Sequence, residues 1–159
     1  MIFLDANVIL RHLVRGTTPE QRRMSEAARA LFRDVRSGKT EVTTTEVVLH
    51  EVSYVLSAKT HYRLSVSDIV AGMKSLLGMR GFKLPTGEKR LYLRALDLYA
   101  ANPQLGFADA IIAERVRAAG IPLATFDATT SSESCTRMGS TITACTGPTK
   151  PAAPAFPYS

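Results

Sequence analysis

The 159-residue chain is poor in the residues that build disulfide frameworks and zinc sites, with only 2 cysteines and 3 histidines. Cys135 and Cys145 both lie near the C-terminal end, and no zinc-finger or His-x-x-x-His spacing occurs. We therefore expect a structural or incidental role for both cysteines. Surface positions or local packing are expected for the histidines, which are His12, His50 and His61.

The chain also lacks long apolar runs. No stretch approaches the roughly 20 residues of a membrane-spanning helix. No basic segment precedes the opening Met-Ile-Phe-Leu-Asp, which is therefore not typical of a signal peptide. These absences favour a cytoplasmic protein with no membrane partner, and the length of 159 residues favours a single globular domain.

Acidic residues are fewer than basic ones, 14 against 20, which gives a net charge of +6. A basic surface on a small domain favours a polyanionic partner, with nucleic acid as the first candidate. Charge alone is a weak signal. It becomes more specific when combined with an acidic pocket, because an enzyme of that kind attracts phosphate chains and holds metal ions against them.

Apolar periodicity predicts alternating strands and helices, which is typical of an α/β domain with a mostly parallel sheet and helices on both faces. Thr18 and Pro19 are typical of an N-cap and a first helical position. Strands are expected at residues 2–4, 41–44, 82–85 and 122–126, and helices at 7–13, 20–36, 45–60, 65–77, 87–101 and 107–119.

The composition changes after Asp127. Residues 128–159 contain half of the prolines, both cysteines and many serines and threonines, and they show no convincing periodicity. We expect one domain at residues 1–127, followed by a poorly ordered tail at 128–159. Within that tail, residues 141–144 are compatible with a single edge strand.

Four carboxylates lie in apolar sequence: Asp5, Glu51, Asp109 and Asp127. Asp5 and Asp127 each end an expected strand, and ligands of open α/β sheets collect at the carboxyl ends of strands. An ionised carboxylate buried alone is strongly unfavourable. Convergence of all four around a divalent cation would remove that cost. For Asp5 or Asp127 alone, capping of the next helix or turn is an equal alternative.

Helical geometry separates the two acids of the 45–60 helix. At about 100° per residue, Glu51 shares a face with Val47, Val48 and Val55 and is expected to point inward. Glu46 is expected on the surface, where the helix dipole favours an acid in the first turn.

Asp109 shares an expected stripe with Ile112, Ala113 and Val116, whereas Glu114 is expected to point away. The alternative for Asp109 is an acid favoured by the start of its helix. Asp97 is expected on a solvated helix edge.

Two polar residues accompany the strand-end acids. Asn7 is placed either to orient Asp5 or to cap the following helix. Thr125 lies two residues before Asp127, on the same side of the expected strand, and is placed to hold a carboxylate or a water bound to the metal.

An all-oxygen ligand set suits Mg²⁺ or Mn²⁺ better than zinc. Such ions lower the pKa of a bound water and stabilise charge on an attacked phosphate. No Ser-His-Asp arrangement or glycine-rich phosphate loop competes with this interpretation.

In these segments the chain resembles the PIN-domain family of metal-dependent nucleases, and among them the small VapC-like toxins of type II toxin–antitoxin pairs. The resemblance extends over residues 1 to about 127. Its segments are Phe3–Leu10, Val47–Leu56, Gly106–Ala113 and Leu123–Asp127.

The resemblance implies an α/β/α sandwich in which Asp5, Glu51, Asp109 and Asp127 bind Mg²⁺ or Mn²⁺ for endoribonuclease hydrolysis. It also implies an RNA substrate, a homodimer and a cognate antitoxin protein that holds the toxin inactive.

The chain departs from the family after Asp127, where a final apolar strand normally completes the sheet. Residues 128–132 replace the usual turn, and the Pro/Ser/Thr-rich tail replaces the strand. We hypothesise a reading-frame change shortly after Asp127. Resequencing that finds no alternative frame encoding a terminal strand would count against it. Such a change would put activity and stability in doubt.

Two other classes compete with a nuclease. One is a degenerate PIN-fold module that binds RNA or protein without cleavage. The other is a phosphotransfer domain of the receiver or haloacid-dehalogenase type. The haloacid-dehalogenase type needs a second Asp where Asn7 stands. The receiver type needs paired acids at an early strand end and a late lysine, which are not visible here.

Overall fold

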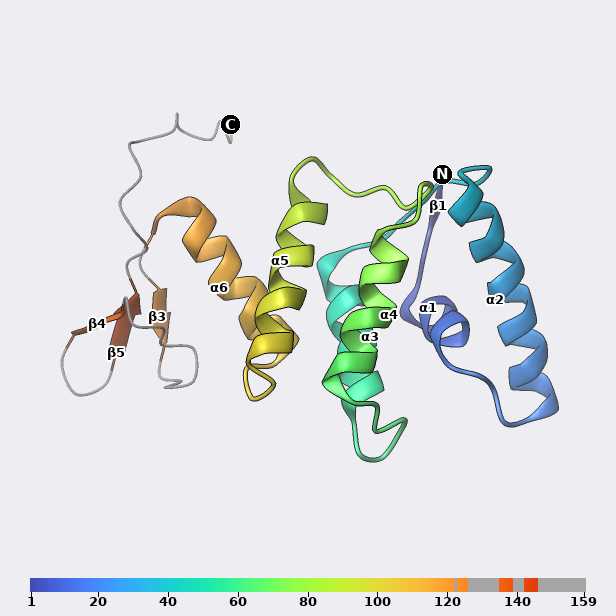
Figure 1. Ribbon diagram of the computed structural model, residues 1–159, viewed down its shortest axis with the longest axis horizontal. Helices are drawn as coiled ribbons and strands as arrows, with labels where there is room; N and C mark the ends of the chain where they lie inside the picture. Colours follow the sequence, from blue (N-terminus) through green and yellow to red (C-terminus); the bar gives the residue numbers. More distant parts are fainter. Residues whose placement is uncertain (122, 126–134, 139–141, 146–159) are drawn as a thin grey trace.

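The computed structural model describes residues 1–121, 123–125, 135–138 and 142–145 (Figure 1). Asp127 and most of the expected tail lie outside these ranges. The described helices and strands, in chain order, are β1 (Ile2–Phe3), α1 (Ala6–Leu13), α2 (Pro19–Ser37), β2 (Val42–Thr43), α3 (Glu46–Ser57), α4 (Val66–Leu77), α5 (Glu88–Ala101), α6 (Phe107–Ala119), β3 (Leu123–Thr125), β4 (Cys135–Met138) and β5 (Ile142–Cys145).

A small parallel sheet begins the fold. β1 pairs in parallel with β2, with Ile2 opposite Val42 and Phe3 opposite Thr43. The backbone N–H of Leu4 donates to Thr43 O at 2.8 Å, and an isolated parallel bridge joins Val42 to Phe82. The predicted α/β class is confirmed as a mixed, largely helical fold with this small parallel sheet.

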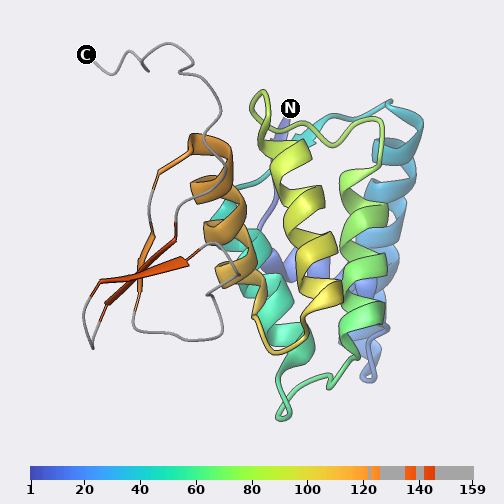
Figure 2. The same cartoon turned by 60° about the vertical axis from the view of Figure 1, so that its left-hand side comes forward.

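The helices surround one apolar core. α3 is central, because it packs on α1, α4 and α6. α2 covers α1 at one end of the helical layer, and α5 packs between α4 and α6 toward the other end (Figures 1 and 2). The largest fully buried side chains come from all of these helices, from the segment after β1 and from the segment between α4 and α5: Leu4, Ile9, Phe32, Leu49, Leu56, Ile69, Met73, Leu76, Leu77, Phe82, Leu96 and Ile111.

Local cap chemistry sets several helix boundaries. The side chain of Thr18 accepts from the backbone N–H of Gln21 at 3.2 Å, and Pro19 is the first helical residue of α2. Ser65 caps α4 in the same way, and Gly120 ends α6 in the left-handed conformation with φ 65°. The predicted start of α2 and end of α6 are therefore confirmed.

The last strands form a separate antiparallel sheet. β3 pairs with β5, with Ala124 opposite Ala144, and β5 pairs with β4, so β5 is a central strand rather than an edge strand. We expected residues 122–126 to join the parallel sheet. Instead, β3 lies beyond α6, on the opposite side of the molecule from β1 (Figures 1 and 2).

Of the helices that the structure describes, none combines the length and apolar character required to cross a membrane.

Candidate functional site

Asp5 lies between β1 and α1, and its carboxylate is exposed. It is the N-cap of α1, because its Oδ1 accepts from the backbone N–H of Ala6 at 2.8 Å. The side-chain Nδ2 of Asn7 donates to the other oxygen, Oδ2, at 3.5 Å. Asp5 therefore caps the helix while Asn7 orients its second oxygen, as one of the two alternatives for Asn7 predicts.

Glu51 is exposed on α3, so the prediction that it points inward is wrong. Val47, from the stripe that we assigned to the core, is 73% exposed, and the neighbouring Tyr54 is 65% exposed. The helix has apolar residues around most of its circumference, so periodicity alone could not select the buried face. The residues that are buried are Leu49, Val52, Ser53 and Leu56.

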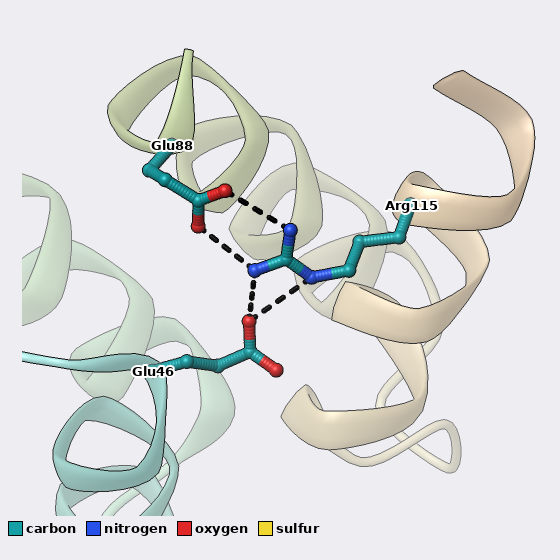
Figure 3. Close-up of polar contacts among 3 residues, drawn as sticks. All are labelled: Glu46, Glu88 and Arg115. Carbon is teal, nitrogen blue, oxygen red and sulfur yellow. Dashed lines mark hydrogen bonds and ion pairs between the residues drawn. The ribbon is translucent and has the colours of Figure 1, made fainter. Parts of the chain in front are cut away.

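Glu46 lies in the first turn of α3, as expected, but it is half-buried and takes part in an ion pair that the sequence did not predict. The guanidinium of Arg115 on α6 donates from Nε to Glu46 Oε2 at 3.1 Å, and Nη2 contacts the same oxygen. Arg115 also binds Glu88 on α5, from Nη1 to Oε1 at 3.0 Å and from Nη2 to Oε2 at 2.8 Å (Figure 3). One arginine therefore joins α3, α5 and α6.

This network also shifts the acid–base behaviour of its members. Hydrogen bonding to Arg115 holds the pKa of Glu88 below its ordinary value. Burial, and hydrogen bonding to Glu88, raise the pKa of the Tyr92 hydroxyl well above its ordinary value. Glu88 is therefore ionised at neutral pH while Tyr92 keeps its proton, so neither is placed to exchange protons near pH 7.

Asp109 is half-buried in the first turn of α6. Its side chain lies over the start of the helix, since a Cβ built on Gly106 would lie 3.5 Å from Asp109 Oδ2. Ile112, expected on the same inward stripe, is 43% exposed. The buried face of α6 is instead formed by Phe107, Ala110, Ile111 and Glu114.

Glu114 is only 7% exposed, which corrects the expectation that it points away from the packed face. Two arginines compensate its charge. Arg94 Nε donates to Oε2 at 2.7 Å and Arg117 Nη2 donates to the same oxygen at 2.6 Å. These hydrogen bonds lower the pKa of Glu114 in spite of the opposing effect of burial. Glu114 is therefore a structural ion-pair residue that holds α6 against α5.

None of the three candidate acids that the structure describes is fully buried, in contrast to the prediction. Asp5 and Glu51 are exposed, and Asp109 is half-buried. The helix of Glu51 nevertheless packs on both α1, which Asp5 caps, and α6, which carries Asp109. Among the residues that the structure describes, no three His, Cys, Asp or Glu side chains are close enough to hold a metal ion. Asp127 lies outside the described residues, and Thr125 is placed only as a member of β3.

The Glu46–Arg115–Glu88 network could not be predicted directly from the sequence. Locally, Arg115 stands between Glu114 and Val116, which indicates no partner on α3 or α5. Its two acidic partners are 69 and 27 residues away in the chain, so the pairing depends on tertiary packing.

In a comparison with known families, the model of the PIN domain matches residues 2–131, which is most of the chain. No curated protein matches the chain significantly.

Proposed function

The chain belongs to the PIN-domain family, whose members are typically nucleases, and we propose that it is a metal-dependent endoribonuclease that hydrolyses RNA phosphodiester bonds. The observation that carries the proposal is the family match over residues 2–131, which includes all four candidate acids. We propose Asp5, Glu51, Asp109 and Asp127 as the catalytic carboxylates and metal ligands.

The donor set fits a hard divalent cation. Carboxylate oxygens are the ligands that Mg²⁺ and Mn²⁺ prefer, and accessible carboxylates can reach a hydrated ion more readily than buried ones. When bound, such an ion supplies an acidified water as nucleophile and stabilises charge on the attacked phosphate.

Other residues of the chain orient the proposed catalytic carboxylates. The hydrogen bond from the Ala6 N–H fixes one oxygen of Asp5, and Asn7 directs the other. Glu51 and Asp109 project from helices that pack together and are further joined by Arg115. We propose that Thr125 supports Asp127 in the same way that Asn7 supports Asp5.

The net charge of +6 supports a polyanionic substrate, because it favours the approach of an RNA chain toward these acids. We further propose that the protein is the toxin of a type II toxin–antitoxin pair, acts as a homodimer and is held inactive by a cognate antitoxin. A nuclease domain at residues 1–127 and an atypical tail at 128–159 complete this proposal.

A metal-dependence assay tests the proposed activity. Purified full-length protein is incubated with end-labelled single-stranded RNA in Mg²⁺, in Mn²⁺ or in EDTA. We expect internal cleavage with either ion and none in EDTA. Cleavage that persists in EDTA, or that starts only from RNA ends, would contradict a metal-dependent endoribonuclease.

One observation favours a second candidate, a non-catalytic PIN-fold module that binds RNA or protein. β3 pairs with β5 and not with β1, so the strand that precedes Asp127 is not beside the strand that precedes Asp5. Metal-independent RNA binding without cleavage in any divalent ion would favour this module.

A further inference from the structure

One side of α2 carries a row of arginines that the proposed catalytic site does not use. At about 100° per residue, the four positions lie within about 60° of one another around the helix. The helix rise of about 1.5 Å per residue spreads them over about 21 Å. We call them the arginine row: Arg22, Arg29, Arg33 and Arg36.

No acid forms an ion pair with the arginine row among the residues that the structure describes. All four side chains are exposed. Glu26 is the one acid of α2 on this side, whereas Glu20 and Asp34 lie on other sides, and Asp34 pairs with Lys39 at 3.8 Å. The row therefore presents a net positive charge to solvent.

The row lies alongside α1, the helix that Asp5 caps. His12 of α1 stacks on Phe32 of α2, with ring centroids 4.1 Å apart. Arg29 and Arg36 lie close enough to His12 to lower the pKa of its imidazole, in addition to the larger effect of burial. The row is thus on the flank of the element that positions one of the proposed catalytic carboxylates.

An open depression of about 520 Å³ continues the row beyond the start of α2, and it is lined by Arg15, Gly16, Thr17 and Arg22. The loop around it is fixed. Gly16 N–H donates to the buried Ser25 Oγ at 3.3 Å, and Thr17 N–H donates to Gln21 Oε1 at 3.0 Å. A side chain at position 16 is excluded, because a Cβ there would lie 2.5 Å from the backbone carbon of Gln21.

We propose that Arg15 and the arginine row form the surface that binds the phosphate backbone of the RNA, with the depression as the seat of one phosphate. Arginine binds phosphate oxygens through two parallel hydrogen bonds, and an extended basic surface follows a nucleic-acid strand. This inference rests on the proposed ribonuclease function, because it assigns the substrate-binding surface of that enzyme.

The structure favours RNA over a membrane surface as the occupant. A membrane-surface helix needs an apolar face free to enter the lipid. The apolar face of α2 is already used in the core, where Ala28, Phe32 and Val35 are at most 6% exposed. The accessible side of α2 therefore carries the exposed arginines of the row, and their positive charge suits a flexible polyanion such as RNA.

Binding in EDTA separates this surface from catalysis, because no metal-dependent cleavage can occur. We compare two double variants with the same loss of charge. Arg29→Gln with Arg33→Gln alters the row. Arg23→Gln with Arg90→Gln is the matched control, since both side chains are exposed and lie away from the row, on α2 and α5. Thermal melts followed by circular dichroism are used to check that both variants fold.

Fluorescence anisotropy with labelled single-stranded RNA, repeated at several KCl concentrations, measures the affinity and its salt dependence. We expect the row variant to bind on the order of tenfold more weakly, and its log–log salt slope to be smaller by about 1.4, or about 0.7 per lost phosphate contact. The control should keep a slope close to that of the parent protein. Equal slopes and affinities in the two variants would overturn the inference.

Two further arms identify the occupant. Binding to phosphatidylserine vesicles and to polyglutamate is measured for the parent protein and the row variant. If such binding depends on the row while RNA binding does not, the occupant is a lipid or an acidic protein, and the proposal of RNA binding is overturned. The cleavage assay distinguishes the two proposals. A salt slope that depends on the row, without any cleavage, would support the RNA-binding surface but contradict the proposed ribonuclease. Cleavage with an unchanged slope in the row variant would contradict only the RNA-binding surface.

Discussion

Arg115 and Glu88 form a bidentate pair, with Nη1–Oε1 at 3.0 Å and Nη2–Oε2 at 2.8 Å, although 27 residues separate them in the chain. The same guanidinium contacts Glu46. Because Glu46 is on α3 and Arg115 is on α6, this contact fixes the two helices that carry Glu51 and Asp109. The network therefore ties together α3 and α6, from which Glu51 and Asp109 project.

Removing this arginine should destabilise the protein measurably. Arg115→Ala leaves Glu46 and Glu88 unpaired, and we expect the free energy of unfolding to fall by about 1–2 kcal/mol. The value is discounted for solvent screening, because the side chains of Arg115 and Glu46 are 41% and 38% exposed. Urea denaturation measures the change, with Arg90→Ala as the control at an exposed position. A loss no greater than that of the control would show that the network contributes nothing.

The stability should also depend on pH through His12. Burial, then the positive charges of Arg36 and Arg29, lower the pKa of His12 in the folded state below the ordinary histidine value of about 6.5. Below pH 6.5 the unfolded chain therefore binds this proton more readily than the folded chain. The contribution is complete above pH 6.5 and is lost as the pH falls through 6.5 toward the folded pKa.

Between pH 7.5 and 5.5 we expect the free energy of unfolding to decrease through His12, because the unfolded chain takes up this proton more readily than the folded chain. His12→Phe keeps the ring on Phe32 but removes the titrating group, so this part of the pH dependence should disappear. His50→Gln, at an exposed position of α3, should retain it. Parallel pH profiles for the parent protein and His12→Phe would exclude this role.

Gly81 lies where two backbone segments meet. A Cβ at this position would lie 2.1 Å from Thr40 O and 2.8 Å from Val35 O. The backbone cannot move away freely, because Gly81 N–H donates to Val35 O and Gly81 O accepts from Val42 N–H. We expect Gly81→Ala to lower the free energy of unfolding by about 2–3 kcal/mol in urea denaturation. The exposed Ser75→Ala on α4 should change it little, and a Gly81→Ala protein as stable as that control would refute the close approach.

Asn7 should affect catalysis more than folding. Its side chain donates to Asp5 Oδ2 but bonds nothing else among the described residues. Asn7→Ala is expected to reduce kcat/KM for RNA by about 10–100-fold, as is typical for a residue that orients a metal ligand. The melting temperature should stay close to that of the parent protein. Full activity in Asn7→Ala would mean that Asp5 needs no orienting partner.

The sequence predicted those features that depend on neighbouring residues. The cap formed by Thr18 with Pro19 and the left-handed Gly120 are local consequences of side-chain and backbone chemistry. The buried faces of α3 and α6 were not predictable in this way. Several faces of α3 are almost equally apolar, and the packing of α1, α4 and α6 around it decides which one is buried.

The acids of the chain illustrate the same limit. Glu46 is paired because Arg115 reaches it from another helix, and Arg94 of α5 reaches Glu114 in the same way. No local pattern indicates these pairs, whereas the pair of Glu114 with Arg117 is three residues apart in one helix. The pairing of β3 with β5 is another long-range choice that strand propensity does not determine. The candidate acids were selected by apolar context, yet in the fold Asp5 and Glu51 are exposed.

Binding of Mn²⁺ to the purified protein, followed by electron paramagnetic resonance, tests most directly whether Asp5, Glu51 and Asp109 share a divalent cation. We predict that Asp5→Asn, Glu51→Gln and Asp109→Asn each weaken Mn²⁺ binding by about tenfold or more, because each removes a charged ligand. Asp97→Asn, at an exposed position paired with Lys74, should bind Mn²⁺ as the parent protein does. Unchanged Mn²⁺ affinity in the Glu51 and Asp109 variants would contradict a shared metal site.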